Sequence, residues 1–258
     1  MIGFFNTYTP EPVAFTVFGT EIMWYGILIA LAIMTAVIIC VKRSAKHDIP
    51  RDTVLDGVII CVPLGLIGAR LYYVAFNWAY YSEDFLRIIN IRHGGLAVHG
   101  GLIAAFLGVY IFCRVRKISP LNGLDLAVPC IVMAQSIGRW GNYFNSEAHG
   151  GPTELPWGIP VGGQLVHPTF LYESIWCFIL FFILIYIDNR RTFEGRTFLA
   201  YGALYSFVRF FVEELRTDSL MLGTLKQAQV LSAAVFIVCI AAMFILGRRA
   251  KRTGRIFS

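Results

Sequence analysis

The sequence predicts an all-α integral membrane protein with seven transmembrane helices. Of its 258 residues, 57% are apolar and only 15% are charged, whereas a soluble domain is about 45–50% apolar and about 25% charged. The apolar residues gather in blocks of about 16–22, long enough to cross a bilayer core of about 30 Å. This composition argues against a disordered chain, a basic nucleic-acid-binding domain and most soluble enzymes.

Seven apolar blocks are expected to form the spans. The first and the last contain no charged residue, while the sixth is short and carries Arg209. The expected spans cover residues 22–41, 57–76, 95–113, 121–138, 168–187, 197–212 and 227–247. Together they predict one transmembrane domain over residues 1–258, in which the Gly- and Pro-rich connection 139–167 forms an outer loop region.

Basic residues in alternate connections predict the orientation. Fifteen Lys and Arg residues follow the first, third, fifth and seventh blocks, against four in the opposite connections and none in the N-terminal tail. Because cytoplasmic loops carry the excess of positive charge, we expect the N-terminus outside and the C-terminus in the cytoplasm. No basic segment precedes the first apolar block, so we expect it to remain as a span rather than to be cleaved as a signal peptide.

Several polar side chains are expected in the outer half of the bilayer. With a helical rise of about 1.5 Å per residue, Arg70, Arg139 and Arg209 fall in one layer, together with Tyr25 and His99. A guanidinium matches phosphate oxygens, and phospholipid phosphates lie near this depth. The arginines therefore favour a lipid-headgroup site. The alternative is that they only pair with carboxylates, namely Glu147, Glu173 and Glu213.

His99 is the candidate proton acceptor. An imidazole is the side chain best suited to take a proton from a thiol or a hydroxyl near neutral pH. The alternative is a histidine at a helix start that is hydrogen-bonded to a loop carbonyl. No spacing among the outer histidines is typical of a metal site, and the six cysteines contain no C-x-x-C pair. We therefore expect neither a metal nor another cofactor. The outer histidines are His93, His99, His149 and His167.

Other classes of membrane protein fit the sequence less well than a lipid-handling enzyme. A transporter or channel with an arginine-lined anion site predicts polar groups that continue to the cytoplasmic face, where only Asp56 and Asp125 occur. A purely structural lipid-binding scaffold does not explain a histidine beside the arginines. Residues 134–138, AQSIG, approach a serine-hydrolase elbow, but Ser136 is expected inside a membrane helix.

The segment that follows the fourth block, GRWGNYFNSEAHG (138–150), is unusually rich in glycine and polar residues for a membrane exit. We interpret it as a backbone cradle in which glycines permit turns with positive φ. The glycines are Gly138, Gly141 and Gly150. The hydrogen-bonding side chains are those of Arg139, Asn142, Asn145 and Glu147.

The chain resembles the bacterial prolipoprotein diacylglyceryl transferases. Segment 138–150 fills every fixed position of that family's signature, G-R-x-G-N-[FY]-x-N-x-E-x-x-G. Three further stretches agree: GGLAVHGG (94–101), HPTFLYES (167–174) and YSFVRFFVEELR (205–216). Phe170 is a departure, because the family commonly has Gln there. With seven expected spans of matching orientation, the resemblance covers nearly the whole chain.

The resemblance implies a multi-pass enzyme of the bacterial inner (cytoplasmic) membrane. Such an enzyme moves the diacylglyceryl group of the membrane lipid phosphatidylglycerol to the lipobox cysteine of a prolipoprotein signal peptide, and glycerol phosphate leaves. Arg139 and Arg209 would hold the phosphate, with His99 as a further catalytic candidate. The other residues expected to bind substrate are Tyr25, Arg70, Asn142, Asn145, Glu147, Gly150 and Tyr205.

Overall fold

The computed structural model of the chain describes residues 10–84, 86–90, 94–217 and 219–253. The expected outer N-terminal tail lies partly outside this described part, and His93 lies wholly outside it. The contacts divide the chain into two compact units. The first unit comprises Met1–Ile39 and Ala127–Ser258, and the second comprises Cys40–Leu126. Each unit is described by itself below, and the single transmembrane domain over 1–258 stays a prediction.

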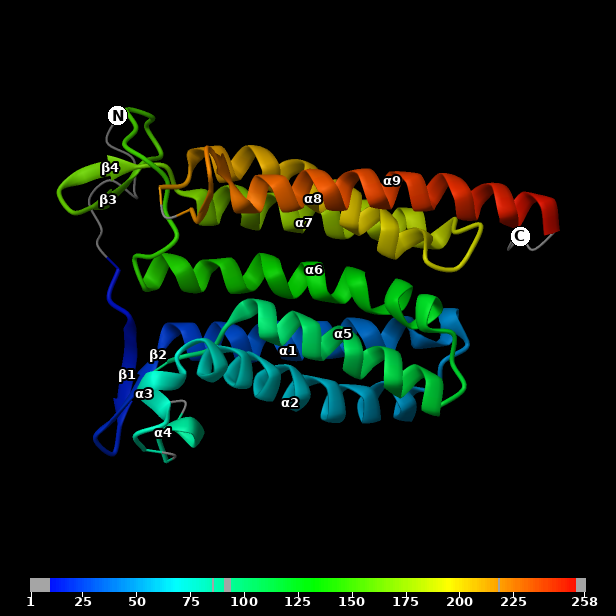
Figure 1. Cartoon of the computed structure of the whole chain (residues 1–258), viewed down its shortest axis with the longest axis horizontal. Helices are drawn as coiled ribbons and strands as arrows, with labels where there is room; N and C mark the ends of the chain where they lie inside the picture. The colour runs from blue at the N-terminus through cyan, green and yellow to red at the C-terminus, as the bar shows by residue number, and fades with distance from the viewer. Residues whose placement is uncertain (1–9, 85, 91–93, 218, 254–258) are drawn as a thin grey trace. The chain divides into compact units, whose positions relative to one another are not determined.

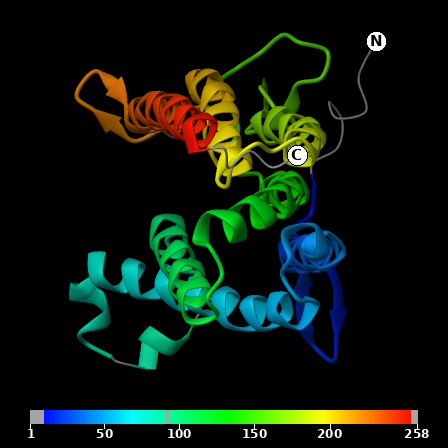
Figure 2. The same cartoon turned by 90° about the vertical axis from the view of Figure 1, so that its right-hand side faces the viewer.

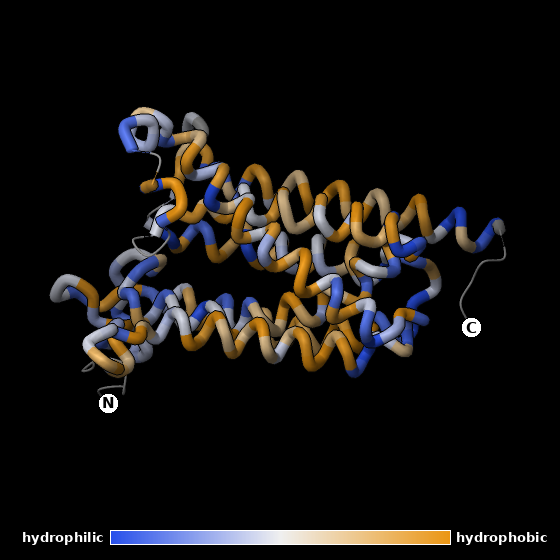
Figure 3. The backbone as a smooth tube through the Cα atoms, turned by 90° about the horizontal axis from the view of Figure 1, so that it is seen from below, coloured by the Kyte–Doolittle hydropathy of each residue, from blue (hydrophilic) through white to orange (hydrophobic). Residues whose placement is uncertain are grey.

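Among the described residues, six helices are long and apolar enough to cross a membrane. They are α1 (Trp24–Arg43), α2 (Arg51–Phe76), α5 (Val98–Val115), α6 (Pro120–Phe144), α7 (Thr169–Asn189) and α9 (Gln227–Thr253). Figure 3 shows apolar residues along their middle stretches and hydrophilic residues near their ends. These helices support the predicted integral membrane protein, and their bounds lie close to six of the predicted blocks.

The sixth predicted span corresponds to α8 (Arg196–Leu215), which is not among these six helices. Four charged residues lower its mean hydropathy, because charged residues are strongly unfavourable on membrane-insertion scales. They are Arg196, Arg209, Glu213 and Glu214. The predicted helix therefore exists, whereas the count of seven spans and the orientation remain predictions.

Helix α6 continues beyond the predicted end of the fourth span at residue 138, so the expected outer loop region is helical as far as Phe144. The helix continues because Tyr143 packs in a buried apolar cluster with Phe170. Gly138 and Gly141 are thus helical rather than parts of turns. The described non-glycine residues with positive φ in this segment are Ser146 and Ala148.

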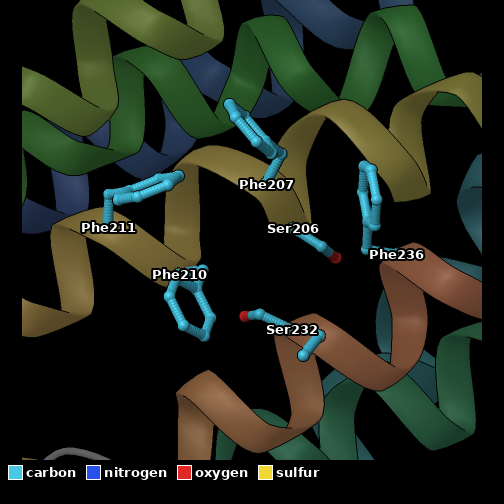
Figure 4. Close-up of a pocket in the computed structure, with 7 residues that line it drawn as sticks. Ser206, Phe207, Phe210, Phe211, Ser232 and Phe236 are labelled. Carbon is cyan, nitrogen blue, oxygen red and sulfur yellow. The ribbon is translucent and has the colours of Figure 1, made fainter.

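In the first unit, α7 packs against α8, and α8 against α9 (Figures 1 and 2). An apolar core joins α6, α7 and α8 and consists of Val132, Cys177, Leu180, Leu184 and Ala200. Between α8 and α9 lies a cleft of about 150 Å³ (Figure 4). Its lining is mainly phenylalanine, with Phe207 and Phe210 from α8 and Phe236 from α9. The cleft is thus apolar, unlike the charged cluster described below.

In the second unit, α2 and α5 pack closely through small residues, as is common between membrane helices. A Cβ added at Gly68 would overlap Ala104, and one added at Gly100 would overlap Tyr72 and the carbonyl of Gly68. The glycines therefore allow the two backbones to approach each other.

Three short antiparallel hairpins, which the all-α prediction did not include, lie outside the long helices. They pair β1 (Val13–Val17) with β2 (Thr20–Met23), β3 (Ile159–Val161) with β4 (Gln164–Val166), and β5 (Met221–Leu222) with β6 (Leu225–Lys226). Their turns use glycines with positive φ, such as Gly19 and Gly223. The remaining elements are short: α3 (Trp78–Tyr81), α4 (Leu86–Ile89) and the 3-10 helix η2 (Ser44–His47).

Substituting Gly100→Ala is expected to lower the thermal unfolding temperature in detergent, because the added methyl group overlaps α2. Overpacking a close contact destabilises by about 1–3 kcal/mol, against a gain of about 1 kcal/mol in helix propensity. Gly26→Ala in α1 is the matched control, since a Cβ there meets no atom within 4 Å. Equal unfolding temperatures for the two variants, measured by scanning fluorimetry, would contradict the close packing of α2 and α5.

Candidate active site

The carboxylate of Glu173 on α7 is the centre of a buried charged cluster in the first unit. Arg139 of α6 contacts Oε2 of Glu173 through Nη2, and Arg209 of α8 donates from Nη1 to Oε1. The Glu173 side chain is only 4% exposed. A buried carboxylate requires such partners, because an uncompensated charge inside a protein is strongly destabilising. Three helices therefore meet at one acidic side chain.

Two further charged residues complete the cluster. Glu213 lies one turn beyond Arg209 on α8. Its Oε2 is 2.5 Å from Nη2 of Arg209. Arg216 follows α8 directly, and its Nη1 is 3.9 Å from Oε1 of Glu173 while its Nε is 4.0 Å from Oε2 of Glu213. The side chain of Arg139 is 25% exposed and that of Arg209 is 18% exposed. The guanidinium groups are therefore the more accessible part of the cluster.

Reciprocal serine hydrogen bonds hold Arg139 and Glu173 side by side. Ser136 of α6 donates from Oγ to the carbonyl of Ser174 of α7 at 2.8 Å, and Ser174 donates from Oγ to the carbonyl of Ser136 at 2.8 Å. Trp140 Nε1 also donates to Ser174 Oγ at 3.1 Å. Ser174 follows Glu173 in sequence, and Ser136 is one helical turn before Arg139. The hydroxyls thus fix the two helices where the ion pair forms.

Tyr205 of α8 is a second partner of Arg139. Its hydroxyl accepts a hydrogen bond from Arg139 Nη2 at 3.1 Å. The Tyr205 ring stacks on Tyr201, with ring centroids 5.6 Å apart. Tyr201 in turn exchanges hydrogen bonds with the amide of Gln135 on α6, at 2.9 and 3.1 Å. Two layers of polar contacts therefore connect α6 to α8 beside the cluster.

Tyr25 lies in the first turn of α1, against Gly141 of α6. A Cβ at Gly141 would be 2.5 Å from Cδ2 of Tyr25. One turn further along α6, Phe144 stacks on Trp24, with ring centroids 5.0 Å apart. Gly141 therefore allows an aromatic ring to approach the helix closely, and it is not part of the turn predicted from the sequence. Tyr25 lies at the same end of α6 as Arg139.

Gly150 connects the signature segment to the end of α8. Its backbone N–H donates to the carbonyl of His167 at 2.9 Å, and the N–H of Gly151 donates to the carbonyl of Leu215 at 2.9 Å. A Cβ at Gly150 would lie 2.7 Å from Cβ of His167 and 2.8 Å from the Leu215 carbonyl oxygen. The segment therefore packs directly beside Arg216.

The remaining signature residues lie around the turn that follows α6. Glu147 is exposed, and its Oε1 accepts a hydrogen bond from Asn145 Nδ2 at 3.2 Å. Its backbone N–H donates to the carbonyl of half-buried Asn142 at 3.0 Å. The sequence offered Glu147, Glu173 and Glu213 as carboxylate partners of the arginines. Among the contacts of the described residues, Glu173 and Glu213 contact an arginine.

Arg70 and His99 belong to the second unit. Arg70 donates hydrogen bonds of 2.6–2.9 Å to five backbone carbonyls. A guanidinium has five N–H donors, so these bonds employ all of them. The substrate-binding role of Arg70 stays a prediction, and its five N–H donors are already used by backbone carbonyls. His99 is exposed in the first turn of α5, with its ring centroid 6.4 Å from that of Tyr72.

The structure thus brings together Arg139, Arg209 and Tyr205. Arg70 and His99, which the predicted layer also included, lie in the second unit, and the layer itself stays a prediction. Arg216 is the member of the cluster that sequence reasoning missed, because it was counted among the loop charges. Its spacing provides the signal: Arg209, Glu213 and Arg216 recur at intervals of four and three residues, which places them on one face of a helix.

Comparison with known proteins identifies the family. Residues 12–245 match the family model described as prolipoprotein diacylglyceryl transferase. A phosphatidylglycerol–prolipoprotein diacylglyceryl transferase of Clostridioides difficile (strain 630) is 50% identical over 241 residues, which cover 93% of this chain and 97% of the relative. A relative of the same name from Finegoldia magna is 48% identical and covers 88% of this chain and 92% of its own length. The chain therefore belongs to the prolipoprotein diacylglyceryl transferase family.

Proposed function

We propose that this transferase moves the diacylglyceryl group of phosphatidylglycerol to the thiol of the lipobox cysteine of prolipoproteins, the first step of lipoprotein maturation. A thioether forms at the glycerol carbon, and glycerol phosphate leaves. The names of the relatives give both substrates. The observation that carries the proposal is the pair of arginines, Arg139 and Arg209, that meet at the buried Glu173.

Arg139 and Arg209 are proposed to bind the phosphodiester of the lipid. Glu173 draws both guanidinium groups to one point, so a phosphate placed beside it meets two permanent positive charges. When the bond between glycerol carbon and phosphate oxygen breaks, its electron pair stays on the phosphate and adds negative charge. A fixed donor at such a position is worth about 3–4 kcal/mol of transition-state stabilisation.

His99 is proposed to accept the proton of the lipobox thiol. A thiol with a pKa of about 8.5 is mostly protonated at neutral pH, and the thiolate is the effective nucleophile. A neutral imidazole is suited to remove that proton. The exposed position of His99 at the start of α5 leaves its ring accessible to a substrate.

The other predicted residues are proposed to shape the substrate site. Tyr205 supports Arg139 through its hydroxyl, and Tyr25 covers the same end of α6. Asn142, Asn145 and Glu147 supply polar groups around the turn after α6, while Gly150 allows that segment to pack at Arg216. These contacts support a role in substrate binding without assigning one lipid atom to each residue.

We propose that α8 is the seventh span of a single transmembrane domain in the bacterial inner membrane, with the N-terminus outside. Its 20 residues reach about 30 Å, the thickness of a bilayer core. Arg209 contacts both Glu213 and the buried Glu173, and such pairing is how proteins accommodate charge at membrane depth. The alternation of basic connections supports the orientation.

Purified protein is expected to form a thioether between diacylglycerol and the cysteine of a lipobox peptide when phosphatidylglycerol is supplied, without added metal or nucleotide. Mass spectrometry of the peptide measures the product directly. Absence of the product, or its formation only after a metal is added, would contradict the proposed reaction.

Arg139→Ala is expected to lower kcat/KM by about 100-fold or more, because one of two charges on the developing phosphate is lost. Arg114→Ala is the matched control, since Arg114 is an exposed residue in the last turn of α5 and should leave the rate unchanged. Size-exclusion chromatography establishes that both variants fold. A folded Arg139→Ala variant with normal turnover would refute the phosphate role.

His99→Asn is expected to lower kcat by about 100-fold or more, the usual contribution of a general base. The asparagine keeps a polar side chain of similar reach but cannot take the thiol proton at neutral pH. Steady-state rates with a lipobox peptide at several pH values test this. Near-normal turnover would eliminate the general-base role and leave the arginine site unaffected.

A further inference from the structure

The guanidinium of Arg70 is enclosed by backbone carbonyls in the second unit. Arg70 is only 7% exposed. Its Nη2 donates to the carbonyls of Arg87 and Asn90 at 2.6 and 2.8 Å, and its Nε donates to that of Ile88 at 2.8 Å. These acceptors lie in the short helix α4 or directly after it. Arg70 therefore ties the end of α4 to α2.

The same guanidinium holds the segment that leads into α5. Its Nη1 donates to the carbonyls of Gly94 and Gly95 at 2.9 and 2.8 Å. Both glycines have positive φ, of 84° and 79°, a conformation that other residues adopt only at a cost. A Cβ at Gly95 would overlap Nη1 of Arg70, whereas one at Gly94 meets no atom within 4 Å. The ring of Tyr81 lies 5.0 Å from the guanidinium carbon, at cation–π distance.

The residues that Arg70 holds directly precede α5. Two residues after Gly95, the N–H of Ala97 donates to the carbonyl of Ala69 at 3.0 Å, beside Arg70 on α2. Ala97 is the N-cap of α5, and His99 is the second residue of that helix. The backbone before His99 is therefore held to α2 by Arg70 and by a direct hydrogen bond.

We propose that Arg70 is a positioning residue for the transferase reaction: it fixes the start of α5, and with it the imidazole of His99, and it does not bind the lipid phosphate. The proposal rests on the function proposed above, in which His99 accepts the thiol proton. An ammonium group cannot replace the guanidinium here, because lysine has three donors and no planar fork. At a phosphate site, in contrast, lysine remains an effective point charge.

The test is the steady-state kinetics of Arg70→Lys with phosphatidylglycerol as the varied substrate. Misplacing a catalytic group by about 1 Å costs up to about 100-fold in rate, so kcat is expected to fall at least tenfold. KM for phosphatidylglycerol should stay within about twofold, because the phosphate ligands are untouched. A rise in KM with unchanged kcat would instead make Arg70 a substrate ligand and overturn the proposal.

Gly95→Ala and Gly94→Ala form a matched pair that does not depend on the folding of the Arg70 variant. Both introduce a methyl group at a positive φ and share that strain. Only Gly95→Ala displaces Arg70, so it should reproduce the loss in kcat while Gly94→Ala stays near the wild-type value. Equal losses for the two variants would mean that backbone strain alone is responsible, and the proposal would be wrong.

Amide hydrogen exchange separates this proposal from the proposed function, because it needs no substrate. Exchange over residues 94–98 should be faster in Arg70→Lys and Gly95→Ala than in the wild type. Faster exchange with unchanged kcat would leave Arg70 as a structural residue only. If His99→Asn keeps a normal kcat while Arg70→Lys loses it, Arg70 acts through another group and the link to His99 is refuted.

Discussion

One buried carboxylate holds together the charged part of this membrane protein. Glu173 lies on the mainly apolar helix α7 and contacts arginines from α6 and α8. Removing one partner of such a pair costs about 3–5 kcal/mol, because the remaining charge is left without compensation in a medium of low dielectric constant. The serine bonds between α6 and α7 and the tyrosine contacts between α6 and α8 keep the three helices in the register that this pairing needs. Helix association and site geometry therefore depend on the same interaction.

Arg70 lies in a different environment from Arg139 and Arg209. Arg139 and Arg209 contact carboxylates, and their side chains remain partly exposed, so an anionic substrate can share their charge. Arg70 contacts neutral carbonyls that use every donor of its guanidinium. Breaking that cage would expose five acceptors at once, which makes its exchange for a phosphate unfavourable. The expected depth in the membrane does not distinguish an arginine that can bind phosphate from one that has a structural role. The chemical nature of the acceptors, carboxylates in one case and backbone carbonyls in the other, does distinguish them.

The helices could be predicted because a membrane helix needs only an apolar block of sufficient length. Candidate site residues could be predicted because charged residues are rare in such blocks and therefore stand out.

The predictions that were wrong or incomplete have physical reasons. Gly141 was expected in a turn, although it makes room for the ring of Tyr25 within a helix. Arg216 was counted as a loop charge, although it follows Glu213 at helical spacing. The acceptors around Arg70 are backbone carbonyls. Every residue has one, so the sequence does not indicate which of them Arg70 contacts. The hairpins are short, and their strands carry too few residues to show an alternating pattern.

Helix α8 shows why a segment proposed to carry the chemistry is also the hardest to recognise. A hydropathy scale assigns each charged residue the free energy of an isolated side chain in lipid, and by that measure all four charged residues of α8 count against it. In the folded protein Arg209 contacts both Glu213 and Glu173, so that the penalty for these buried charges is largely compensated. Arg209, which we propose to bind the lipid phosphate, is thus also one of the residues that lower the apparent hydrophobicity of its helix. An enzyme that works on phospholipid headgroups is therefore expected to place its site on the helix with the weakest membrane signal, protected by neighbours such as α7 and α9.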